Sequence, residues 1–342
     1  MMETFWYCAV TLMLAVYAVL DGFDFGLGIV YRFVTRTEAD RRIALAAIGP
    51  VWNGNEVWLI AAGGLLFFAF PKAYAAGFSG FYLALILVLW LLIARGLALE
   101  LRSHLDHILW RQFWDVAFAG SSTLLAVVLG AALGNLIRGM PLTQDGYFFV
   151  ALWTDFMTGP DPGILDWFTV LMGITSAATL ASHGANYLAM KTDGQLRGQA
   201  RRAAWLTGSA VAVLVGLAVT AVPFVQPSFY LNYVAHPIGY VFPFVGLAAL
   251  VAALGLRRRN RDTGAFYATS LMILAMLASM AWGSYPNILI ATNDPANSVT
   301  VTNATAGAYG MEIGLWWFLI GFGLIIIYQV IAHRAFWGKV QL

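Results

Sequence analysis

Long apolar stretches separated by short polar segments constrain the fold of this chain more than any other feature of its sequence. A transmembrane helix needs about 20 mostly apolar residues to cross roughly 30 Å of hydrocarbon. We therefore predict an all-α integral membrane protein of about nine transmembrane helices, built as a single polytopic domain over residues 1–342. The predicted spans are 5–33, 51–70, 74–98, 114–137, 163–190, 204–224, 236–256, 264–284 and 312–332, with a tight hairpin at 71–73.

Composition narrows the class of protein further. Hydrophobic residues make up 61% of the chain and charged residues 11%, whereas soluble chains carry about 25% charged residues. The net charge of +2 is too small to indicate a nucleic-acid partner. Cys8 is the only cysteine, which excludes an internal disulfide and a cysteine-ligated iron–sulfur cluster within this chain.

The distribution of basic residues predicts the orientation of the helices. Cytoplasmic loops carry an excess of Lys and Arg, and with nine crossings all but two of the 19 Lys and Arg fall on one side. Only Lys72 and Arg138 fall on the other side. We therefore expect the N-terminus outside and the C-terminus in the cytoplasm, and an error of one helix in the count would destroy this asymmetry.

Two carboxylates, Asp21 and Asp24, stand inside the first predicted helix and are three residues apart, so they share one face. A charge near the bilayer centre costs about 2.5–3.5 kcal/mol on insertion scales, and such residues usually face the protein interior. One interpretation is a proton relay or a ligand-facing pair. The other is a pair of hydrogen-bonded carboxyls that locks helices together.

A second polar group opens the next helix, where Asn53, Asn55 and Glu56 lie between Trp52 and Trp58. Capping of the helix N-terminus would explain Glu56, but two Trp around polar residues favour a packed polar site. Glu100, with Arg95, Arg102, His104 and His107, lies at the inner end of the third helix. We interpret the two histidines as part of a solvated charge cluster.

A lone intramembrane histidine, His183, could ligate haem or move protons, but hydrogen-bonded packing is the favoured interpretation. We find no metal-ligand, phosphate-loop or nucleophile motif in the sequence, so no catalytic centre and no metal site is predicted within this chain.

Several of these segments resemble subunit II of the cytochrome bd-type quinol oxidases, a family that includes cyanide-insensitive bd-like oxidases. The resemblance is carried mainly by residues 20–192 and is less specific after them. The matching segments are 21–26, 49–58, 61–64, 67–71, 74–82, 100–103 and 183–192, with a weaker match at 285–287.

The resemblance implies a haem-free subunit of a terminal oxidase in a bacterial-type cytoplasmic membrane, whose complex oxidises quinol and reduces oxygen to water. Its partner, subunit I, would hold two b-type haems and haem d. The resemblance is also compatible with a small single-helix subunit in the complex and with a bound lipid or quinone molecule. It also implies two four-helix bundles, 1–137 and 163–284, plus a peripheral ninth helix, 312–332.

The resemblance further implies a proton path from the cytoplasm, with Asp21, Asp24, Asn53, Glu56 and Glu100 as candidates. Many members of the family have Asp at the position of Asn53, and Asn cannot titrate, so we expect Glu56 or Asp24 to supply the titratable group. Trp52 and Trp58 are candidates for simple packing or for an oxygen route.

Two other interpretations stay open at this point. The first is an ion-coupled secondary transporter that binds its ion with the intramembrane carboxylates, although the sequence has no clear inverted repeat. The second is a structural scaffold whose acidic residues only fix helix packing.

Overall fold

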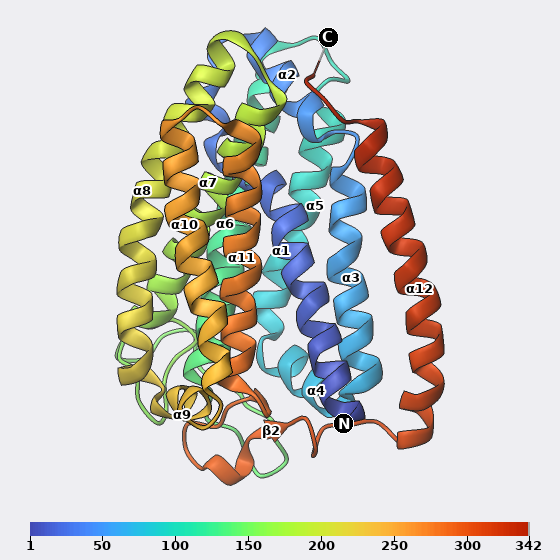
Figure 1. The fold of residues 1–342 in the computed structure, drawn as a ribbon, viewed down its shortest axis with the longest axis vertical. Helices are drawn as coiled ribbons and strands as arrows, with labels where there is room; N and C mark the ends of the chain where they lie inside the picture. The colour runs from blue at the N-terminus through green and yellow to red at the C-terminus, as the bar shows by residue number, and fades with distance from the viewer. Residues whose placement is uncertain (341–342) are drawn as a thin grey trace.

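A computed structural model describes residues 1–340, so the last two residues of the predicted domain lie outside the described part. Long helices run side by side along the longest axis, and the two termini lie at opposite ends of the bundle (Figure 1). The helices are α1 Met2–Val34, α2 Glu38–Ile48, α3 Trp52–Ala69, α4 Pro71–Gly80, α5 Tyr82–Leu101, α6 Ile108–Arg138, α7 Trp167–Lys191, α8 Gly194–Val225, α9 Pro227–Ala235, α10 Val241–Arg258, α11 Asp262–Ser284 and α12 Ala308–Ala335.

Each of the nine predicted spans overlaps one of the long helices of the described chain. Seven of them are long and apolar enough to cross a membrane, which confirms an all-α, multi-pass membrane protein. The exceptions are α3 and α7, which carry the polar segments around Asn55 and His183. The number of crossings, the division into bundles and the orientation stay predictions.

Three local predictions were wrong. The span predicted at 74–98 is broken at Phe81 into α4 and α5. The predicted hairpin residues 71–73 are the first turn of α4, because Pro71 fits the first position of a helix. The span predicted from residue 163 begins at Trp167, because the Asp166 side chain caps the helix by accepting hydrogen bonds from Phe168 N and Thr169 N.

Short elements cover the two ends of the bundle. At one end lies α2, and its Thr37 and Asp40 form a capping box. At the other end α9 lies across the bundle, near a small antiparallel sheet of β1 Asn287–Leu289 and β2 Val299–Thr300 (Figure 1). Two one-turn 3₁₀ helices, Pro237–Tyr240 and Pro295–Asn297, complete the described elements.

The centre of the bundle is α1, which packs against α3, α6, α7 and α11. Its crossing with α7 is close: a Cβ at Gly26 would lie 1.7 Å from the Leu180 carbonyl oxygen, and a Cβ at Gly184 would lie 2.1 Å from the Leu27 nitrogen. Only glycine fits at both positions, as in other close contacts between membrane helices. By contrast, α12 stands at the edge beside α3 (Figure 1) and is largely exposed.

Candidate functional site

The buried carboxylates of α1 form the core of the candidate site. Asp21 and Asp24 have no solvent exposure, and they face side chains of α3 and α5. We define the carboxylate site as Asp21, Asp24, Asn55, Glu56 and Arg95. The structure thus brings together three of the predicted residues, Asp21, Asp24 and Glu56.

The cation of the carboxylate site is Arg95 of α5, which is fully buried. Its Nη1 and Nη2 donate to the two oxygens of Asp21 at 2.5 and 3.1 Å. Its Nη2 lies 3.4 Å from Glu56 Oε2, and the guanidinium carbon lies 4.4 Å from the centre of the Phe25 ring. The sequence groups Arg95 with the charged residues at the end of the third predicted span, but this part of α5 turns Arg95 toward α1, where it bonds Asp21. The sequence feature that could have predicted the role of Arg95 is a single basic residue within one apolar stretch and single carboxylates within another.

Asn55 of α3 joins Asp24 to the rest of the site. Its Nδ2 donates to Asp24 Oδ2 at 2.9 Å and to the Leu20 carbonyl at 3.2 Å. Asp24 Oδ1 is buried and has no hydrogen-bond partner among the described residues. The hydrogen bond to Asp24 therefore comes from a neutral amide, whereas Asp21 and Glu56 lie against the guanidinium of Arg95.

The charges of the site do not balance when all its groups ionise. The site holds three carboxyls and one guanidinium, which contacts Asp21 and Glu56, so complete ionisation would leave two uncompensated negative charges. Isolated charges are costly there. Protons are the natural counterions, and the arrangement can therefore store and exchange protons.

Other predicted residues lie outside the carboxylate site. Asn53 and Glu100 are exposed, on α3 and at the inner end of α5. Trp52 lies beside Gly96, where a Cβ would come 3.4 Å from its ring. Trp58 is buried, and its ring contacts Phe322 edge-on with centroids 6.3 Å apart. In the structure the amide that reaches the carboxylates is Asn55 and not Asn53, and the roles of Asn53, Glu100 and the two Trp stay predictions.

Ion pairs connect α2, the end of α5 and the start of α6 at the end of the bundle that α2 covers. Arg102 is almost fully buried and donates to both oxygens of Glu38 at 2.9 Å and to Asp115 at 2.5 Å. Asp115 also accepts from Tyr31 at 2.7 Å and from Arg41 at 3.1 Å. The hydrogen bond from Arg102 holds the pKa of Glu38 below its ordinary value. His104 and His107 are exposed, as expected for solvated residues.

A second ion cluster joins α8, the end of α10 and the start of α11, where Asp262 accepts from three arginines. Arg197 and Arg201 reach it from α8 at 2.5 and 2.6 Å, and Arg257 pairs with it from the end of α10. Arg257 also bonds the Asn186 side chain of α7. The basic residues predicted to lie on the inner side therefore fix helix ends to one another.

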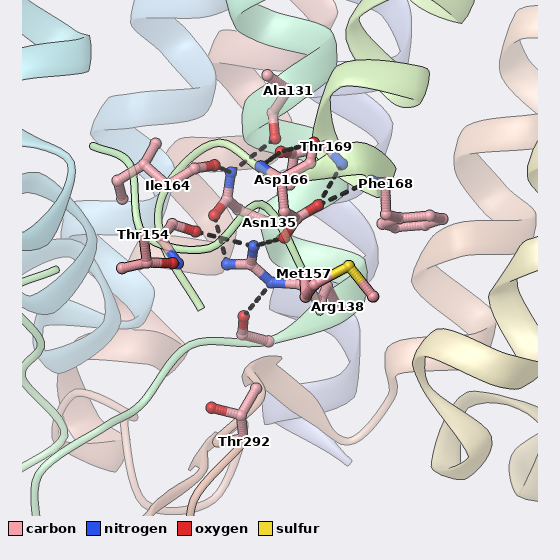
Figure 2. A network of polar contacts seen from close by, with 12 residues as sticks. Ala131, Asn135, Arg138, Thr154, Met157, Ile164, Asp166, Phe168, Thr169 and Thr292 are labelled. Atoms are coloured by element: carbon pink, nitrogen blue, oxygen red, sulfur yellow. Dashed lines mark hydrogen bonds and ion pairs between the residues drawn. The ribbon is translucent and has the colours of Figure 1, made fainter. Parts of the chain in front are cut away.

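A buried network surrounds Arg138 at the end of α6, one of the two basic residues predicted to lie on the outer side (Figure 2). The guanidinium donates to the Gly163 carbonyl at 2.9 Å and to Asn135 Oδ1 at 2.7 Å, and it forms an ion pair with Asp166. Asp166 also caps α7. This network anchors the loop between α6 and α7.

His183 of α7 is fully buried and hydrogen-bonded through both ring nitrogens. Nδ1 lies 2.8 Å from Thr269 Oγ1, and Nε2 lies 3.0 Å from the Val19 carbonyl. The ring also stacks on Phe266 with centroids 4.9 Å apart. Neither nitrogen is free to ligate iron, which agrees with a packing role. Residues 1–340 contain no group of three or more His, Cys, Asp or Glu that could hold a metal ion.

Comparisons with known proteins identify the family of this chain. The sequence profile described as cytochrome bd terminal oxidase subunit II matches residues 2–336. A probable cytochrome oxidase subunit 2 of Haemophilus influenzae is 30% identical, with 98% of this chain and 94% of that protein covered. The cytochrome bd-I ubiquinol oxidase subunit 2 of Escherichia coli is 29% identical with the same coverage.

The fold has a counterpart among solved structures. A chain of the bd oxidase from Geobacillus thermodenitrificans superposes with a TM-score of 0.75 at 19% identity, and 98% of each chain is covered. At this identity the match supports the fold alone.

Proposed function

The chain belongs to the cytochrome bd terminal oxidase subunit II family, and from this premise we propose that it is the haem-free second subunit of a bd-type quinol oxidase in a bacterial cytoplasmic membrane. The observation that carries this proposal is the family match over residues 2–336. The complex would oxidise quinol and reduce oxygen to water on a haem-bearing subunit I. The engagement of both His183 nitrogens in hydrogen bonds supports a chain that leaves the haems to its partner.

The proposal includes nine crossings, with the N-terminus outside and the C-terminus inside. Each predicted span overlaps a long helix, and the chain ends lie at opposite ends of the bundle (Figure 1). With this orientation, the clusters around Asp115 and Asp262 lie at the cytoplasmic face, as the positive-inside rule requires.

The test of the assembly is spectroscopic. The chain is purified gently in detergent from its native membrane, and a reduced-minus-oxidised visible spectrum is recorded. We expect b-type haem and haem d bands in the co-purified complex, which disappear when the chain is isolated. A monodisperse preparation without haem would contradict the proposal.

We further propose that the carboxylate site takes part in proton uptake from the cytoplasm. The observations in support are a site with three carboxyls and a single guanidinium, and a buried oxygen of Asp24 without a hydrogen-bond partner among the described residues. Asp24 would act as the exchanging group, while Asp21 holds Arg95 in place.

Asp24→Asn in the intact complex is the decisive variant, because it keeps the shape and removes the exchangeable proton. We expect slower proton uptake in proteoliposomes with unchanged haem content. Glu56→Gln tests the other candidate carboxyl in the same assay. Full turnover with an unchanged pH profile in Asp24→Asn would refute the role of Asp24, and the same result in Glu56→Gln would remove Glu56.

A further inference from the structure

The ninth long helix, α12, packs one narrow stripe of residues between Gly314 and Gln329 against α1 and α3. Gly314 lies against the Phe68 ring, Phe318 packs on Trp6 with centroids 5.5 Å apart, and Phe322 contacts Trp58. These positions recur every four residues, so they form one stripe of the helix. Seven residues after Phe322 the same stripe presents a polar side chain, Gln329.

Gln329 bonds directly to the carboxylate site. Its Nε2 donates to Asn55 Oδ1 at 3.2 Å, and Asn55 in turn donates to Asp24. The directions of these bonds are fixed by the Leu20 carbonyl, which can only accept. Asn55 must therefore turn its Nδ2 toward Leu20 and Asp24 and its Oδ1 toward α12, so that Gln329 must present its nitrogen. A side chain of α12 thus supplies the hydrogen bond that Asn55 Oδ1 accepts.

One turn closer to the C-terminus, His333 carries a free proton acceptor. Its Nδ1 lies 3.0 Å from the Gln329 carbonyl, which can only accept, so the neutral ring carries its proton on Nδ1. The other nitrogen, Nε2, is buried and has no partner among the described residues. The charged side chain that faces this histidine is Lys191 at the end of α7, whose Nζ donates to the Phe336 carbonyl at 2.6 Å.

We propose that α12 is a working part of the proton route: Gln329 donates to the Asn55 amide that bonds Asp24, and His333 receives protons from the cytoplasmic side at Nε2. This inference rests on the proposed proton uptake at Asp24. Nε2 accepts one proton to give an imidazolium and then releases it toward the ionised carboxyl of Asp24, which becomes a neutral acid. The amides of Asn55 and Gln329 do not carry the proton. They provide polar groups between α12 and Asp24 along which water molecules can relay it.

The test uses the intact oxidase complex in proteoliposomes, with oxygen consumption and proton uptake measured between about pH 6 and about pH 9. Four variants are compared: His333→Gln, Gln329→Leu, Asp24→Asn as the reference and Tyr328→Phe as the control. Tyr328 neighbours Gln329 on α12 but lies outside the hydrogen-bond chain. Haem content of each preparation verifies that the complex has assembled.

We expect His333→Gln to stay within about twofold of the unaltered complex at low pH and to lose about tenfold at high pH, where protons are scarce and a relay base matters most. Gln329→Leu should slow proton uptake at every pH, because Asn55 Oδ1 loses its donor and the polar side chain that links α12 to the carboxylate site is removed. Tyr328→Phe should not change the pH profile.

The outcomes separate the two proposals. If Asp24→Asn loses proton uptake while both α12 variants behave like Tyr328→Phe, the role of α12 is refuted and the proposed function stands. If Asp24→Asn is fully active, the proton-uptake role itself fails. Should either α12 variant assemble poorly, His333→Asn and Gln329→Met provide the same comparison with smaller changes in shape.

Discussion

Removal of the Arg95 guanidinium should destabilise the complex by about 3–5 kcal/mol, the usual cost of breaking a buried ion pair from one side. The structure accounts for this magnitude. Arg95→Met deletes two charge-assisted hydrogen bonds to Asp21, at 2.5 and 3.1 Å, and each such bond contributes about 1.5–3 kcal/mol. The Met side chain fills much of the space, so the loss is mainly electrostatic.

A double-mutant cycle with Asp21→Asn isolates this effect. In the double variant neither the buried anion of Asp21 nor its cation remains, so we expect it to be more stable than Arg95→Met alone. The assay is denaturant unfolding of the purified complex in detergent, followed by tryptophan fluorescence. Arg32→Met, at an exposed position of α1, is the matched control and should change stability by less than about 0.5 kcal/mol. Strictly additive effects of the two substitutions would refute the reasoning.

Three further predictions concern other parts of the fold. Gly26→Val should prevent assembly or sharply lower the yield of haem-containing complex, because its Cβ would overlap the α7 backbone; normal yield would show that the crossing can open. Asp166→Asn should destabilise the protein by about 3–5 kcal/mol in a denaturant titration, since it leaves the buried Arg138 without its anion, and an unchanged midpoint would contradict this. The lowered pKa of Glu38 means that its stabilising contribution is present above its unfolded pKa and is lost as pH falls through its folded pKa. Glu38→Gln should therefore show a smaller loss of thermal stability on acidification, and parallel pH curves for the two proteins would rule this out.

Helix positions could be predicted from the sequence because apolar length alone identifies a membrane helix. The errors occurred where a single side chain determines the helix boundary. Pro71 starts a helix that the hydropathy pattern merges with the next one, and Asp166 delays the start of α7 by capping it. The short α9 at the outer surface has no periodic apolar run long enough to reveal it.

The candidate site was only partly predictable. Asp21 and Asp24 stand out because carboxylates inside an apolar span are rare. The partners of these two carboxylates depend on how each helix is rotated about its axis relative to its neighbours, and this rotation cannot be read from one sequence. Asn53 and Asn55 look equivalent along the chain, yet only Asn55 turns inward, and Gln329 becomes relevant only once α12 is seen to lie on α3.

The close crossing of α1 and α7 at Gly26 and Gly184 also bears on how this protein can work. Rocking transporters need an interface whose side chains can slide or repack as one half tilts against the other. Here backbone lies on backbone, and a lateral shift would drive peptide groups into each other. The crossing therefore makes a rigid frame of α1 and α7, and the proposed proton uptake would proceed by short hops between fixed side chains while the helices stay in place.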